Sequence, residues 1–153
     1  MKNINIRPAL EGDLPAIVAL VVELSNEIDG ADATDSALIE WNVQETFRDP
    51  KTQFLVAHKS GRVVGFVNFT TRRTIIHPSS SGLIDELIVS REYRGEGIGS
   101  SLISGVVARC REMGCCELEV STLMSNEKAR NFYKKQGFDE ESVLLEMQLD
   151  IWI

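Results

Sequence analysis

A glycine-rich loop carries the clearest chemical signal in the chain. Its residues are Arg94, Gly95, Glu96, Gly97, Ile98 and Gly99. An apolar run at residues 83–89 precedes the loop and indicates a buried strand, and residues 98–113 place apolar side chains on one face of a helix. Free N–H groups gather at the first turn of a helix, and glycine lets an anion approach without a Cβ in the way. We therefore expect a phosphate-bearing ligand at this loop.

Two common phosphate-binding loops do not fit these residues. A P-loop has Lys followed by Ser or Thr after its last glycine, whereas Ser100 and Ser101 follow Gly99. The dinucleotide fingerprint needs a third glycine at the position of Leu102. A plain capped helix start is the remaining alternative, and it explains one glycine better than three.

The pattern of residues 94–99 resembles the pyrophosphate loop of the GNAT superfamily, the acyl-CoA-dependent N-acyltransferases. Residues 85–94 resemble the strand and lead-in that precede that loop in the family. Residues 126–138 resemble the second family signature, in which an Asn opens a helix, Phe-Tyr lies near its end and Gly-Phe leads into a strand. Two motifs in the family's order are more specific than either alone. The resemblance covers residues 83–138 by motif and the earlier residues by architecture only.

The resemblance implies acetyl-CoA as the co-substrate. The loop backbone and the helix start would hold its pyrophosphate, with Arg94 adding a charge-assisted contact unless it is a solvated turn residue. The main chain of residues 87–89 would pair with the pantetheine arm, and an N–H near Val89 would polarise the thioester carbonyl. Asn126 would contact the pantetheine, cap its own helix, or do both. The expected cofactor-binding residues are Leu87, Ile88, Val89, Arg94, Gly95, Glu96, Gly97, Ile98, Gly99, Ser100, Asn126 and Tyr133.

The implied reaction is direct attack of an amine on the thioester, and it requires a general base. An alkylammonium has a pKa near 10 and must lose a proton before it attacks. Asp85 and Glu86 are the candidates, because they precede the thioester position and an acidic side chain in an apolar strand is costly unless it is paired. Strand alternation sends the two to opposite faces, so only one would face the acceptor. We favour Glu86 slightly; a structural carboxylate paired with an arginine is the alternative for either.

By the same resemblance Tyr133 would protonate the CoA thiolate as it leaves. The alternative for Tyr133 is a core aromatic ring with its hydroxyl group hydrogen-bonded. Covalent catalysis is not expected, because no His or Asp motif accompanies the cysteines. The cysteines Cys110, Cys115 and Cys116 have no metal-ligand spacing, so we expect no metal either.

Hydrophobic periodicity predicts the elements that position these residues. Strands are expected at residues 3–7, 53–58, 63–71, 83–89, 116–121 and 143–149, and helices at residues 14–28, 36–47, 98–113 and 126–136. Together with the resemblance, this order predicts an α/β (α+β) fold: a single mixed, largely antiparallel sheet of six to seven strands with helices on both faces. We expect one domain over residues 1–153.

Composition narrows the class of partner. The chain is 43% hydrophobic and 25% charged, with a formal net charge of −7. Residues 1–50 carry three basic and ten acidic groups, which account for that whole charge. The acidic cluster of Glu23, Glu27, Asp29, Asp32 and Asp35 is either a solvated face or a field that attracts a cationic substrate. An acidic chain without a basic stripe argues against nucleic acid.

We therefore expect an acetyl-CoA-dependent N-acetyltransferase acting on a small cationic amine. The first residues lack an apolar signal region and no apolar run is long enough for a membrane span, which favours a cytoplasmic protein. Two other functions stay open: a non-catalytic acyl-CoA-binding or sensory module, and acetylation of protein N-termini or lysines. Homodimers are common in the family, so a homodimer is an open alternative to a monomer.

Overall fold

The computed structural model describes residues 3–29 and 35–150 of the chain. These residues fall into two compact units, the first ending at Val120 and the second beginning at Ser121. The first unit contains the sheet and the helices α1 (Leu14–Asp29), α2 (Ser36–Arg48) and α3 (Ile98–Glu112), whereas the second contains α4 (Glu127–Lys135) and the C-terminal segment. Our expectation of a single domain stays a prediction.

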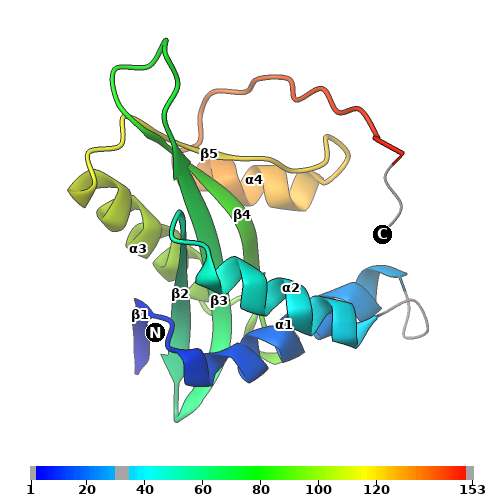
Figure 1. The fold of residues 1–153 in the computed structure, drawn as a ribbon. Coiled ribbons are helices and arrows are strands. Elements are labelled where there is room, and N and C mark those ends of the chain that lie inside the picture. Colours follow the sequence, from blue (N-terminus) through cyan, green and yellow to red (C-terminus); the bar gives the residue numbers. More distant parts are fainter. Residues whose placement is uncertain (1–2, 30–34, 151–153) are drawn as a thin grey trace. The chain divides into compact units, whose positions relative to one another are not determined.

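Five strands form one mixed sheet in the described part of the chain, in the spatial order β1-β2-β3-β4-β5 (Figure 1). Neighbouring strands are antiparallel, except that β4 and β5 are parallel. The strands are β1 (Ile4–Pro8), β2 (Thr52–Lys59), β3 (Arg62–Arg72), β4 (Ser81–Val89) and β5 (Glu117–Val120). The mixed, largely antiparallel sheet is confirmed, and the predicted number of six to seven strands was too high.

The strand predicted at residues 143–149 does not form among the described residues. Residues 139–150 form no regular secondary structure, and Val143, Leu145 and Met147 are 77%, 88% and 83% exposed. Apolar alternation favoured a strand here, but a strand also needs a neighbour that accepts and donates its backbone hydrogen bonds. No strand of the described residues pairs with this segment, so the prediction was wrong.

Helices cover both faces of the sheet (Figure 1). The helices α1 (Leu14–Asp29) and α2 (Ser36–Arg48) pack on one face, where Ile17 shares a buried cluster with Phe66. On the other face lies α3 (Ile98–Glu112), because a Cβ added to Gly65, the neighbour of Phe66, would be 3.4 Å from Leu102. This arrangement confirms the predicted helices on both faces. None of the helices in the described residues is long and apolar enough to cross a membrane.

Candidate active site

The glycine loop joins β4 to α3, with the short 3-10 helix η3 (Arg91–Tyr93) in between. Gly95 and Gly97 have φ angles of +81° and +83°, a left-handed conformation that glycine adopts at no steric cost. The hydrogen-bond ladder of α3 begins with Ser101 N–H, which donates to the Gly97 carbonyl oxygen at 3.1 Å. The N–H groups of Ile98 and Gly99 precede that bond, so they have no intrahelical acceptor.

The loop therefore fits an anionic group on its outer side. A Cβ added to Gly95 would meet nothing within 4 Å, which leaves space beside the backbone, and Gly97 is the N-cap of α3. Ile98 is 1% exposed and anchors the start of α3 in the core. The partial positive charge of the helix start then faces the same side as its unpaired N–H groups.

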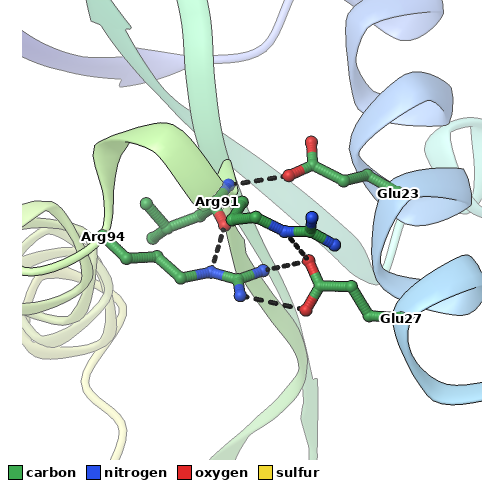
Figure 2. A network of polar contacts seen from close by, with 5 residues as sticks. Glu23, Glu27, Arg91 and Arg94 are labelled. Carbon is green, nitrogen blue, oxygen red and sulfur yellow. Dashed lines mark hydrogen bonds and ion pairs between the residues drawn. The ribbon is translucent and has the colours of Figure 1, made fainter.

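Arg94 is held by α1 and by the end of β4 (Figure 2). Its Nη1 and Nη2 donate to the two carboxylate oxygens of Glu27 at 3.0 and 3.1 Å, and its Nε donates to the Val89 carbonyl oxygen at 3.1 Å. This bidentate pair lowers the pKa of Glu27 below its usual range. A direct contact between Arg94 and a pyrophosphate stays a prediction, and in this structure the guanidinium is committed to Glu27.

The acidic cluster near the end of α1 has a structural use that the sequence did not reveal. Glu23 accepts a hydrogen bond from the Arg91 backbone N–H at 2.7 Å, and Glu27 accepts from Arg91 Nε at 3.2 Å (Figure 2). Asp35 caps α2 by accepting from Leu38 N–H at 3.0 Å. The other two members of the cluster, Asp29 and Asp32, have side chains outside the described residues. Three of the five acidic groups therefore have structural partners.

Glu96, the acidic residue inside the loop, also has a cationic partner. Its carboxylate forms an ion pair with Lys59 at the end of β2. The Lys59 ammonium in turn lies over the ring of Tyr93, 5.4 Å from its centroid. The negative charge of Glu96 is thus balanced from the neighbouring strand, which favours an anion at the loop.

A β-bulge in β4 determines where the two candidate bases point. Asn68 of β3 pairs with Glu86 and Phe69 pairs with Ile84, so Asp85 is an extra residue without a partner in the ladder. Glu86 shares a face with Asn68, and Asp85 accepts a 3.4 Å hydrogen bond from Thr70 on that same face. The expectation that Asp85 and Glu86 point to opposite faces was wrong, because the bulge interrupts the alternation on which it rested.

The carboxyl groups of Asp85 and Glu86 both reach solvent, yet neighbouring protein atoms displace part of their hydration. This desolvation raises the pKa of Asp85, and the hydrogen bond from Thr70 opposes the rise. Desolvation likewise raises the pKa of Glu86; a hydrogen bond from Asn68 opposes it, and the nearby charge of Asp85 adds to it. A carboxylate with a raised pKa is a stronger base, which suits proton removal near neutral pH.

Beside these carboxylates, one edge of β4 has no strand partner in the part of the chain that the structure describes. Strand β5 pairs only with residues 81–84 of β4, and among the described residues no strand pairs with the same edge at residues 87–89. Ser90 N–H donates to the Val64 carbonyl oxygen toward β3 at 2.8 Å, so by alternation the N–H groups of Leu87 and Val89 point away from β3. An extended ligand can therefore pair with this edge as a further strand.

Two predicted site residues belong to the second unit. Asn126 caps α4 (Glu127–Lys135), since its Oδ1 accepts from Ala129 N–H at 3.1 Å. The Tyr133 ring is half-buried, with its centroid 5.1 Å from that of Phe132 and 5.6 Å from that of Phe138. Burial raises the pKa of Tyr133, so its hydroxyl group keeps its proton at neutral pH. Contacts of Asn126 and Tyr133 with acetyl-CoA stay predictions.

Sequence reasoning missed Asn68 and Glu27, which position predicted site residues. Asn68 stands in the otherwise apolar run Val63–Phe69 of β3, and a polar side chain in a buried strand needs a partner. The cost of burying an unpaired polar side chain is a signal by which the sequence could have identified Asn68. Glu27 gave no comparable signal, because an acidic residue near a helix end is ordinary at a protein surface. The described residues contain no group of three or more His, Cys, Asp or Glu that could hold a metal ion.

The structure is an α+β fold in which a glycine-rich helix start and an edge of β4 without a strand partner among the described residues lie near two carboxylates. The model of the Acetyltransferase (GNAT) family matches residues 18–138, so the chain belongs to this family. GNAT enzymes use acetyl-CoA, and the chain is an acetyl-CoA-dependent N-acetyltransferase.

Individual relatives agree with this assignment. The aminoalkylphosphonate N-acetyltransferase of Salmonella typhimurium is 29% identical over 136 residues, which cover 88% of this chain and 84% of that protein. A possible acetyltransferase from Clostridium difficile has a TM-score of 0.86 at 21% identity, covering 99% of this chain and 100% of its own. An aminoglycoside N-acetyltransferase solved in complex with CoA has a TM-score of 0.81 at 16% identity, and the match covers 97% of this chain and 96% of that chain. The two structures support the fold alone.

Proposed function

We propose that this enzyme moves the acetyl group of acetyl-CoA to a primary amine of a small cationic acceptor, with Glu86 as general base and Tyr133 as general acid. The β-bulge at Asp85 is the observation that carries the proposal. It brings two carboxylates to one face of β4, directly before the free edge at residues 87–89. A thioester bound along that edge would lie next to a base with a raised pKa.

The donor would bind in two places that the first unit offers. Its pantetheine arm pairs with the outward N–H groups of Leu87 and Val89, which act as strand partners. Its pyrophosphate accepts hydrogen bonds from the loop, whose backbone is open at Gly95 and whose helix start is at Gly97. Arg94 shapes this site through its bonds to Glu27 and to the Val89 carbonyl.

The proposed mechanism assigns one proton transfer to Glu86 and one to Tyr133, and both groups have raised pKa values because of desolvation. The acceptor arrives as an ammonium, and Glu86 takes one proton from it, directly or through water. The neutral nitrogen attacks the acetyl carbonyl; a C–N bond forms, and the C–S bond breaks with its electron pair on sulfur. Tyr133 gives its proton to the CoA thiolate. The second proton lost by nitrogen returns to Tyr133, and Glu86 releases its own proton to solvent.

The acceptor class rests on Asp85 rather than on the acidic cluster of α1. Glu27 is ion-paired with Arg91 and Arg94, so its charge adds less to a field for a cationic substrate, whereas Glu23 and Asp35 are each held by a backbone N–H and keep their charge. The Asp85 carboxylate lies on the face of Glu86 and is exposed. While Glu86 deprotonates one amine, Asp85 can bind a second positive group of the same acceptor. Diamines, polyamines and sugars with two or more amino groups have this arrangement.

A thiol-release assay with acetyl-CoA and a panel of amines tests the acceptor class. The panel contains a polyamine, an aminosugar, an aminoalkylphosphonate and a peptide with an N-terminal alanine, because the relatives' names include acceptors of the last three kinds. We expect the highest kcat/KM for acceptors with two positive groups. Asp85→Asn should lower that value about tenfold through the acceptor KM. A preference for the aminoalkylphosphonate or the peptide would contradict the proposed class.

The identity of the base is tested by two isosteric variants. Glu86→Gln should lower kcat by about 100-fold or more, since general bases contribute factors of that size. Asp85→Asn should keep kcat within about tenfold of the parent enzyme, because it removes binding but not proton transfer. A large fall in kcat for Asp85→Asn together with a small change for Glu86→Gln would assign the base to Asp85. CoA affinity, measured by calorimetry, serves as the control for both variants.

A further inference from the structure

Asn68 is a buried polar residue at the centre of β3. It is 2% exposed, and among the described residues only Ser81 is another buried polar residue. Its neighbours in sequence, Val67 and Phe69, are both 0% exposed. Burying an amide costs free energy unless its oxygen and its nitrogen both find partners. The partners of Asn68 therefore indicate what the residue does.

The side-chain oxygen of Asn68 completes the β-bulge. Its Oδ1 accepts a 3.0 Å hydrogen bond from the backbone N–H of Glu86. The extra residue Asp85 disturbs the ladder at this point, so the Asn68 side chain supplies the acceptor that the β3 backbone would otherwise provide. Since a backbone N–H can only donate, the oxygen of the amide must face it.

The side-chain nitrogen of Asn68 is the donor of an amide that lies on the same face of the sheet as the Glu86 carboxylate, since the two residues are paired. A hydrogen bond from Asn68 to that carboxylate lowers the pKa of Glu86 against the larger rise caused by desolvation. The Asn68 amide thus bonds the backbone of Glu86 directly, and it lies on the same face of the sheet as the Glu86 side chain because the two residues are paired. This placement lets one amide bear both on where the carboxylate stands and on how strongly it holds a proton.

We propose that Asn68 is a positioning residue for the general base, acting on catalysis through Glu86 and touching neither substrate. The inference rests on the proposed role of Glu86. It goes beyond structural support of the bulge, because an amide donor on the face of the Glu86 carboxylate would favour its charged form as well as fix its place. A residue that only completed the bulge would need its oxygen and not its nitrogen.

Asn68→Asp separates these two roles. The variant keeps an oxygen for the Glu86 N–H, but it loses the donor to the carboxylate and adds a negative charge. The acid limb of the kcat/KM profile reports the base of the free enzyme, and we expect it to move upward by about one pH unit. Asn68→Ala should move it in the same direction, with a lower melting temperature. The KM for acetyl-CoA should stay within about twofold in both variants.

Ser81→Ala provides the matched control. Ser81 is equally buried, and its hydroxyl donates to Glu117 at 3.3 Å, away from the bulge. This variant should lose stability without moving the acid limb. If Asn68→Asp does not fold, the acid limb of Asn68→Ala decides the question. An unmoved acid limb in the folded variants would overturn the inference and leave Asn68 with a structural role only.

A double-variant comparison distinguishes failure of this inference from failure of the proposed base. In a Glu86→Gln background, Asn68→Ala should change kcat by no more than about twofold, because Asn68 acts through a group that is already absent. If Glu86→Gln alone retains activity, the proposed base is wrong and the inference falls with it. If Glu86→Gln loses activity and Asn68→Ala lowers kcat further by the same factor as in the parent enzyme, only the inference is wrong.

Discussion

Arg94 and Glu27 form a two-bonded ion pair between the glycine loop and α1. The guanidinium Nη1 and Nη2 lie 3.0 and 3.1 Å from the two carboxylate oxygens (Figure 2). The same guanidinium is bonded through Nε to the last residue of β4, Val89. One side chain therefore connects the strand that carries the candidate base, the loop expected to bind the donor and the helix that covers the sheet. Two parallel bonds to a planar cation fix its direction as well as its position.

Glu27→Gln should loosen this connection. The variant keeps the size of the side chain but loses the charge that holds Arg91 and Arg94, so the loop should be less ordered. We expect CoA to bind about threefold to tenfold more weakly in calorimetry. Glu45→Gln breaks another exposed ion pair, with Arg48 on α2, and should leave CoA affinity unchanged. Tighter binding in Glu27→Gln would instead mean that Glu27 withholds Arg94 from the ligand.

Gly97→Glu should abolish CoA binding. Gly97 has a φ of +83° and caps α3, so a side chain there is strained and its negative charge would occupy the anion site. Affinity should fall by about 100-fold or more. Gly114→Glu is the matched control, because Gly114 follows the end of α3 with a φ of +75° and open space around an added Cβ. Equal losses of affinity in the two variants would count against the loop assignment.

Glu86→Gln should make the protein more stable near neutral pH. The folded structure raises the pKa of Glu86, so above that pKa folding carries the cost of a poorly hydrated charge. Gln removes this cost. The gain should be present at about pH 7.5 and should disappear well below the unfolded pKa of about 4.3, where the carboxyl group is protonated in both states. Melting temperatures at the two pH values check this, with a rise of about 2 °C expected only at the higher one.

Tyr133→Phe should lower turnover far more than CoA affinity. Phenylalanine keeps the ring contacts with Phe132 and Phe138 and removes only the proton donor. We expect kcat to fall by about 100-fold, with CoA affinity within about twofold. The chain has one other tyrosine, Tyr93, whose ring lies below Lys59, and Tyr93→Phe should retain the parent kcat. Full activity in Tyr133→Phe would remove the hydroxyl group from the mechanism.

Much of the fold could be predicted, because its elements have strong local signals. The structure places three elements within one or two residues of their predicted limits: the helix α3 after the glycine loop, and the strands β2 and β3. The segment at residues 143–149 failed for a different reason. Its alternation is a local property, whereas a strand exists only with a hydrogen-bonded neighbour, and pairing across the sheet has no local signature.

The site was predictable in its residue types but not in its geometry. Asp85 and Glu86 stood out as acids in an apolar strand, and their raised pKa values follow from that setting. Their common face did not follow, because a bulge depends on the partner strand. The partners Asn68 and Glu27 lie 18 and 67 residues from the groups they bind, a separation that no short motif spans.

The bulge has a consequence for how this enzyme can change. Asp85 is the single residue by which β4 exceeds β3 between Ile84 and Glu86. Deleting it would restore unbroken pairing along the strand, so the sheet could survive the loss while one of the two carboxylates left the face it shares with Glu86. An insertion at the same point could supply a different second group. With the acceptor role proposed for Asp85, insertion or deletion at this position would change the range of accepted amines as substitution would.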